Sequence, residues 1–340
     1  MTAYTLRETP AIATIYQPAL IIDHVRRCEV DTRRILREAG LEPAVLHDAA
    51  CRISAMQLCR LFEATFAAIT GPDEPFLLGQ SLLPAHFGAA SHAMALAPDL
   101  GHALEALCRH ASVLSPLLRP RLRMEGALAV LYFTDSHGTG SVHHRLVDLQ
   151  MSAVVAMARW LGGQRLPWQF CFNRTPPRRC AQYEVHLGPS LRFNCQLDAL
   201  LIDARWLAVP WPRGNALAAA MAGREAAAQD HAPGVVDALY DHLFEHIRRA
   251  PTLDSAAAAL GVSPATLKRH LAQSGTHFQA ELDRVRTHVS LHLFHTVGMD
   301  NSRAAAYLGF HDAANFRRSF KRWTGLTPCS LRASLLPGPA

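Results

Sequence analysis

Two short helical segments near the C-terminal end of the sequence carry the side chains best suited to bind another molecule. Each segment turns cations outward, and an ammonium or guanidinium group can pair with a phosphate or donate hydrogen bonds to the edge of a base. The outward residues are Ala265, Thr266, Lys268 and Arg269 in the first segment, and Arg317, Arg318, Lys321 and Arg322 in the second.

The positive charge of the chain is concentrated in the same region. The chain has 340 residues and a formal net charge of +6, and residues 251–340 contribute ten Lys and Arg against five Asp and Glu. A positive segment on a near-neutral body is the electrostatic pattern of a protein that binds a polyanion. Because basic, solvated helices are common, the pattern has to be judged together with the elements that position the cations.

The first basic segment follows a short helix and a glycine turn. Gly261 stands where a tight turn requires a positive φ, Ser263 is a helix cap, and Pro264 suits the first turn of the next helix. The inner face of the short helix comprises Leu253, Ala257 and Leu260. A short helix, a tight turn and a second helix with a basic outer face together predict a helix-turn-helix unit.

The same order of features recurs 48 residues later, where Gly309 makes the turn and Asp312 caps the next helix. The inner positions of this second unit are Ala304, Ala305, Leu308, Phe316, Phe320 and Trp323. Between the units, a long helix is predicted by the apolar stripe Phe278, Leu282, Val285, Val289 and Leu293. A repeated unit joined by a rigid helix is a much stronger signal than one isolated match.

The segment from Leu253 to Arg332 resembles the DNA-binding domain of AraC/XylS-type transcription regulators along its whole length. The resemblance is carried by Ala259 to Pro264 with Leu267-Lys268-Arg269, by Leu308-Gly309-Phe310, by Asn315 to Gly325, and by Thr327-Pro328 with Arg332. It implies that both recognition helices enter successive major grooves on one face of the DNA. It places Ala265, Lys268 and Arg269 of the first helix, and Ala313, Ala314, Arg317 and Arg318 of the second, at base-reading positions. We expect Thr266, Asn315, Lys321 and Arg322 to contact the DNA as well.

Four positions depart from the pattern of that family. Asn301 and Ala304 stand where large aliphatic side chains are usual, Ala256 replaces a leucine, and Leu331 replaces an aromatic residue. We therefore expect looser packing in the second unit. The alanines at positions 313 and 314 can offer apolar contact, for instance to a thymine methyl group.

The N-terminal body is predicted to have an α+β fold. Helical spacing dominates the first hundred or so residues, and a β-hairpin is expected over residues 121–133 with its turn at Glu125-Gly126. Further strands are expected at residues 168–172 and 190–202, on either side of a short helix near residues 179–185. The whole chain is thus expected to be an α+β sensor domain followed by an all-α domain with two helix-turn-helix units joined by a long linker helix.

From Ala19 to Trp211 this body resembles the effector-binding domain of a subset of the family that includes ornithine- and arginine-responsive regulators. The matching stretches are Ile35 to Leu41, Leu77 to Leu83, Gly101 to Leu107 and Pro176 to Leu187. We expect residues 1–212 to bind a small-molecule effector or to dimerise, and residues 234–340 to bind DNA. Residues 213–233 are expected to form a helical linker that ends in a hinge at His231-Ala232-Pro233-Gly234. The sequence does not identify the residues that line an effector site.

Other functions are compatible with single features of the sequence. Residues 242–246 spell H-x-x-E-H, a zinc-protease signature, and His288, His292 and His295 share a helical face. An exposed helix face explains both patterns, so we expect no metal and no cofactor. Residues 1–212 contain no nucleophile–base pair, phosphate loop or metal-ligand spacing, which argues against an enzyme. Two alternatives remain: an N-terminal domain that only dimerises or binds a partner protein, and an enzyme domain fused to a DNA-targeting module.

The cysteines and the N-terminus indicate where the protein works. Eight cysteines are scattered without any C-x-x-C pair, as in a reduced cytosolic protein. Arg7 and Glu8 stand in an N-terminus without an apolar core of signal-peptide length, so we expect a cytoplasmic protein. The expected partners are double-stranded DNA, a second copy of the chain in a homodimer, RNA polymerase and a small-molecule effector, but no membrane.

Overall fold

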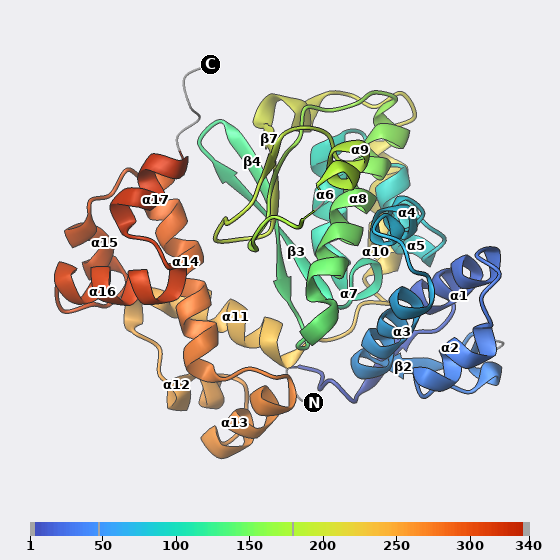
Figure 1. Ribbon diagram of the computed structural model, residues 1–340, viewed down its shortest axis with the longest axis horizontal. Coiled ribbons are helices and arrows are strands. Elements are labelled where there is room, and N and C mark those ends of the chain that lie inside the picture. The colour runs from blue at the N-terminus through green and yellow to red at the C-terminus, as the bar shows by residue number, and fades with distance from the viewer. Residues whose placement is uncertain (1–3, 47, 179, 336–340) are drawn as a thin grey trace. The chain divides into compact units, whose positions relative to one another are not determined.

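The computed structural model describes residues 4–46, 48–178 and 180–335, and of residues 332–335 it describes the backbone alone. The chain forms two compact units (Figure 1). Residues 5–234 make the N-terminal unit, and residues 235–335 together with Tyr4 make the C-terminal unit. The chain therefore passes from one unit to the other twice, after Tyr4 and after Gly234.

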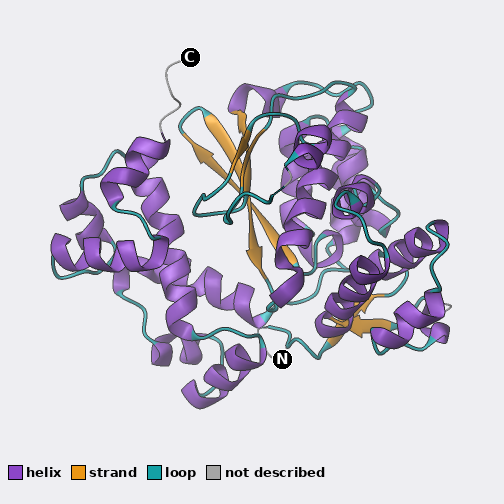
Figure 2. Cartoon of the chain, viewed as in Figure 1, coloured by secondary structure: helices purple, strands orange, loops and turns teal. Residues whose placement is uncertain are grey.

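The N-terminal unit combines helices with a five-stranded and a two-stranded sheet (Figure 2). In chain order its elements are β1 (Pro10–Ala13), α1 (Gln17–Arg27), α2 (Thr32–Glu38), β2 (Arg52–Ser54), α3 (Ala55–Ala68), α4 (Glu74–Gln80), α5 (Gly88–Ala95), α6 (Leu100–Arg109), α7 (Ala111–Leu114), β3 (Leu118–Glu125), β4 (Leu128–Asp135), α8 (His143–Gly162), β5 (Gln169–Cys171), α9 (Ala181–His186), β6 (Leu191–Arg192), β7 (Ala199–Asp203) and α10 (Ala216–Ala226).

The larger sheet has the strand order β3-β4-β7-β5-β6, and its pairs are antiparallel except for β5 with β6. Side chains alternate between its two faces, and one face joins the main apolar core beneath the helices. The cross-strand neighbours Leu122, Leu131 and Leu200 lie on this core face. The sheet and its helices thus share one core, as a layered α+β domain requires.

The predicted hairpin is confirmed, with β3 and β4 joined at Gly126, whose φ of +61° suits a tight turn. The prediction of a single strand at residues 190–202 is wrong, because two strands, β6 and β7, form there. Between them Asn194 has a φ of +57°, and the carboxylate of Asp198 accepts a hydrogen bond from the backbone N–H of Asn173 at 2.8 Å. These polar residues bend the chain away from a straight strand. The short helix expected there forms as α9, and Arg179 lies outside the described residues.

The C-terminal unit is all helical among its described residues. Its helices are α11 (Val235–His246), α12 (Leu253–Ala259), α13 (Pro264–Gln273), α14 (Phe278–His295), α15 (Asn301–Tyr307), α16 (Ala313–Thr324) and α17 (Pro328–Leu335). The long helix α14 packs against α11, α15, α16 and α17 (Figure 1). The α+β domain and the all-α domain predicted from the sequence are both confirmed.

The alanine-rich helix and the loop after it belong to the N-terminal unit. α10 packs against α5, and the Asp230 carboxylate then accepts hydrogen bonds from Ser112 Oγ and interacts with His110 Nδ1, each at 2.8 Å. The backbone N–H of Thr5 donates to the carbonyl of Pro233 at 2.8 Å. Residues 213–233, expected to be a helical linker that ends in a hinge, are therefore attached to the N-terminal unit up to Pro233.

Candidate DNA-binding surface

The first helix-turn-helix unit consists of α12, a glycine turn and α13. Gly261 has a φ of +70°, and Ser263 Oγ caps α13 by accepting a hydrogen bond from the backbone N–H of Thr266 at 3.1 Å. Leu267 and Leu271 are fully buried on the inner face of α13. This geometry leaves the predicted residues on the opposite side, where Ala265, Lys268 and Arg269 are exposed and Thr266 is partly exposed.

The second unit repeats this construction in α15 and α16. Gly309 has a φ of +75°, and Asp312 Oδ1 caps α16 by accepting from the backbone N–H of Asn315 at 2.6 Å. That N–H is the main reason why the pKa of Asp312 is lowered, so the cap stays ionised at neutral pH. Phe316 and Phe320 are buried. Of the predicted residues, Ala314, Arg317, Arg318, Lys321 and Arg322 are exposed, and Ala313 and Asn315 are partly exposed.

Most of the exposed cations have no partner among the described side chains. Neither hydrogen bonds nor ion pairs engage Lys268, Arg269, Arg317 or Lys321 there. Arg318 donates from Nη2 to Asn315 Oδ1 at 2.5 Å, and Arg322 Nη2 lies 3.7 Å from Asp283 Oδ2 on α14. Two basic faces with unpaired charge are thus available to an anionic partner. The side chain of Arg332 lies outside the described residues.

The departures from the family pattern are accommodated inside the fold. Ala256, Ala304 and Leu331 are buried, and Asn301 is partly buried at the first residue of α15. An aromatic cluster fills the second unit, with ring-centroid distances of 5.5–6.4 Å that link Phe294, Phe310, Phe316, Phe320 and Trp323. Looser packing of this unit stays a prediction.

Two charged residues that the sequence did not single out hold the recognition helices in place. Arg286 of α14 lies with its guanidinium 4.8 Å from the ring centre of Phe310 and 5.8 Å from that of Trp323. Burial lowers the pKa of Arg286, but an arginine side chain keeps its charge in proteins. The sequence contained a signal for this contact. Arg286 lies off the apolar stripe of α14, and the two aromatic residues that it contacts, Phe310 and Trp323, follow in the second unit.

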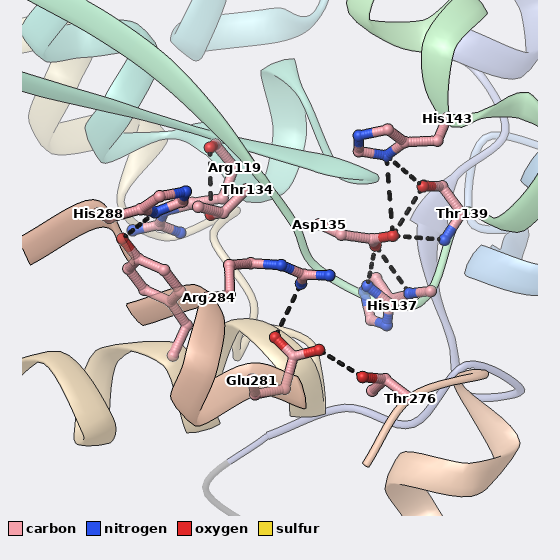
Figure 3. Close-up of polar contacts among 12 residues, drawn as sticks. Arg119, Thr134, Asp135, His137, Thr139, His143, Thr276, Glu281, Arg284 and His288 are labelled. Carbon is pink, nitrogen blue, oxygen red and sulfur yellow. Dashed lines mark hydrogen bonds and ion pairs between the residues drawn. The ribbon is translucent and has the colours of Figure 1, made fainter. Parts of the chain in front are cut away.

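The second of these residues is Glu281, near the start of α14. It is fully buried, and its carboxylate accepts hydrogen bonds from Thr276 Oγ1 at 2.5 Å and from Arg284 Nη1 at 2.8 Å (Figure 3). The contact with Thr276 attaches the loop after α13 to α14. A buried carboxylate requires such partners, and its removal would leave them unpaired.

The N-terminal end of the chain also reaches a recognition helix. Tyr4 is buried in the C-terminal unit, and its hydroxyl lies 3.0 Å from Nδ1 of His270 on α13. The two rings meet edge to face at 5.9 Å. The sequence offered no signal for this contact, because 266 residues separate its partners.

The histidines that suggested a metal take part in other contacts. His242 and His246 stack on each other at 4.5 Å, and His288 Nδ1 lies 2.9 Å from the hydroxyl of Tyr240. In the part of the chain that the structure describes, no group of three or more His, Cys, Asp or Glu side chains is arranged to hold a metal ion.

Comparison with known proteins agrees with this geometry. Residues 30–211, more than half of the chain, match the family described as the arabinose-binding domain of AraC transcription regulators, and residues 256–334 match a helix-turn-helix domain family. The chain belongs to the AraC family of transcription regulators. It is a sequence-specific DNA-binding regulator with an N-terminal effector-binding domain, and it is not an enzyme.

Full-length relatives of this AraC-family chain carry regulator names. It is 25% identical over 332 residues to the ornithine utilization regulator of Pseudomonas aeruginosa. The matched region covers 96% of this chain and 98% of the relative. It is 26% identical over 319 residues to the transcriptional regulator VirS of Mycobacterium tuberculosis, with 92% and 93% coverage. The crystal structure of the regulator CdpR from Pseudomonas aeruginosa matches with a TM-score of 0.40 and 20% identity, and covers 88% of this chain and 96% of that one. Among the described residues, no helix is both long and apolar enough to cross a membrane.

Proposed function

We propose that α13 and α16 are the two recognition helices and that each enters a major groove of double-stranded DNA. The proposal rests on the repeated geometry, in which each helix follows a left-handed glycine turn, is capped by a side chain and turns an exposed basic face outward. The proposed DNA contacts are Ala265, Thr266, Lys268, Arg269, Ala313, Ala314, Asn315, Arg317, Arg318, Lys321 and Arg322. Helix α14, with 18 residues, is about 27 Å long, a length compatible with two grooves about one helical turn apart.

The first prediction concerns the bases. Arg269→Ala and Arg318→Ala are each expected to weaken binding to the specific site by about 1–3 kcal/mol. Each substitution removes a guanidinium group and with it the two hydrogen bonds that this group would donate to a guanine. Binding is measured by fluorescence anisotropy with an operator found by genomic binding-site mapping. Arg224→Ala on α10, which also removes one exposed cation, is the control and keeps full affinity. Normal operator binding by both recognition-helix variants would disprove the assignment.

The second prediction concerns the phosphates. Lys321 lies one helical turn beyond Arg317 and has no described partner, so we expect its ammonium group to contact phosphate. Lys321→Ala should weaken binding to specific and to non-specific DNA equally. It should also reduce the slope of log K against log salt by about one counterion. Arg322→Ala should reduce the slope by less, because Asp283 already lies 3.7 Å from its guanidinium. A loss confined to one base position, at unchanged slope, would contradict a phosphate role for Lys321.

We further propose that residues 1–212 sense the effector and dimerise, that residues 213–233 link this part to the rest, and that residues 234–340 bind DNA. A dimer would present four recognition helices, and the second half-site would bind at high effective concentration. In this proposal the regulator acts in the cytoplasm and contacts RNA polymerase. Analytical ultracentrifugation tests the dimer, and transcription with purified polymerase tests the contact. A monomer at concentrations that saturate the operator would contradict the dimer.

A further inference from the structure

A groove in the N-terminal unit is lined by residues of α4, α8 and α9 and by Arg165 after α8. Its volume is about 490 Å³, which lies within the range of small-molecule sites. The backbones of α4 and α8 touch at Gly79, where an added Cβ would lie 2.3 Å from the carbonyl oxygen of Leu149. The groove is bordered by the last residue of α4, the second half of α8 and the end of α9.

The floor of the groove is polar but already hydrogen-bonded. Ser152 is buried, and its Oγ donates to the carbonyl of Phe76 at 2.9 Å. His186 is held at both ring nitrogens, with Nε2 3.0 Å from Asp73 Oδ1 and Nδ1 3.0 Å from Gln80 Nε2. The ring also stacks on Phe76 at 4.9 Å, so this wall of the groove is rigid.

The rim of the groove carries two cations and two exposed apolar side chains. Arg159 and Arg165 form no hydrogen bond or ion pair with any described side chain, and the lining includes neither Asp nor Glu. Trp160 is 67% exposed and Val185 is 69% exposed, although large apolar side chains are usually buried. A cation in the last turn of a helix stabilises that helix, which accounts for Arg159. It does not account for Arg165, which lies beyond α8.

We infer that this groove binds a small carboxylate with an apolar body, and that this ligand is the effector of the N-terminal domain. The inference rests on the proposed sensing role of residues 1–212. The carboxylate pairs with the guanidinium groups of Arg159 and Arg165, and a guanidinium can donate two parallel hydrogen bonds to the two carboxylate oxygens. The apolar body covers Trp160 and Val185. A cationic amine is excluded from the groove, because two positive charges would oppose it and the Asp73 carboxylate is already engaged by His186.

Matched acids and amines test the inference with the full-length protein. Phenylacetate and hexanoate are compared with phenethylamine and hexylamine, which have the same bodies and the opposite charge, by thermal unfolding and tryptophan fluorescence. The acids are expected to raise the Tm and to change the fluorescence, and the amines are expected to do neither. In the Arg159→Gln/Arg165→Gln variant the Kd of the acids should rise about tenfold or more. The control variant Arg213→Gln/Arg224→Gln also removes two exposed arginines and should bind the acids normally.

The variant Trp160→Phe tests whether the fluorescence change comes from a ligand bound in the groove or from a change elsewhere in the protein. It should abolish most of the fluorescence change while the acids still raise the Tm. The inference is overturned if the amines stabilise the protein as well as the acids do, or if the double glutamine variant binds the acids normally. It is also overturned if neither acid stabilises the wild-type protein at about 10 mM, where a Kd of about 1 mM would give a clear shift. A different outcome is that the wild-type protein binds neither acid and self-associates, while the double glutamine variant stays monomeric. That result would show that a second copy of the chain, and not a carboxylate, covers the groove.

Operator binding separates this inference from the proposed function. Without ligand, the double glutamine variant should bind the operator as the wild-type protein does, since both arginines lie outside the C-terminal unit. Acid binding that changes operator affinity in the wild-type protein, and not in the variant, supports both proposals. Acid binding without any effect on operator affinity supports the carboxylate site and contradicts its role as the effector site.

Discussion

The Phe316→Ala variant is expected to lose about 3–5 kcal/mol of unfolding free energy in the C-terminal unit, and with it most operator binding. Phe316 is fully buried on the inner face of α16. Its ring lies 6.0 Å from Phe294 on α14, 5.5 Å from Phe310 at the glycine turn and 5.6 Å from Phe320. Truncation would open a cavity where α14, the turn and α16 meet, so the recognition helix would lose its support.

Urea unfolding followed by circular dichroism and tryptophan fluorescence measures this loss. The chain has two compact units, so the transition of the C-terminal unit has to be followed separately. Leu217→Ala on α10 is the control, because it truncates a side chain that is 74% exposed and should change stability by less than about 0.5 kcal/mol. An unchanged transition in Phe316→Ala, with normal operator binding, would show that α16 does not depend on this core.

The Gly234→Ala variant is expected to destabilise the N-terminal unit by about 1–3 kcal/mol or more, as overpacking of a tight contact does. A Cβ at residue 234 would lie 2.0 Å from the carbonyl oxygen of Ser136 and 2.7 Å from the ring of His137. The turn that carries both residues cannot easily move aside. Asp135 fixes it by accepting hydrogen bonds from the backbone N–H groups of His137 and Thr139 at 3.0 and 2.7 Å (Figure 3).

His137 is buried, so its ring has little room to move away from an added methyl group. Burial lowers the pKa of His137 to about 4, so the ring stays neutral at neutral pH and packs as an uncharged group. Thermal unfolding of Gly234→Ala and hydrogen exchange at residues 136–139 measure the effect. Gly71→Ala is the control, because an added Cβ there meets nothing within 4 Å, and it should be neutral or slightly stabilising. Equal stability of the two variants would mean that Gly234 is a free hinge.

The sequence alone was sufficient for the elements that depend on local chemistry. Gly261 and Gly309 have the positive φ that a tight turn requires, and Ser263 and Asp312 cap the helices that follow them. The spacing of the apolar residues in the sequence predicted which faces of α13 and α16 are exposed. A cap acts over three residues and a helical stripe over one helix, so each can be read from a short stretch of sequence.

The tertiary structure alone decided what depends on residues far apart in the chain. Pro233 and Gly234 are hinge-forming residue types, yet contacts with Thr5 and with the turn after β4 attach them to the N-terminal unit. Tyr4 reaches His270 across almost the whole chain. The groove between α4, α8 and α9 likewise combines residues from three separate segments. Such contacts arise from the packing of whole elements against one another, and no local propensity encodes which distant side chains will meet.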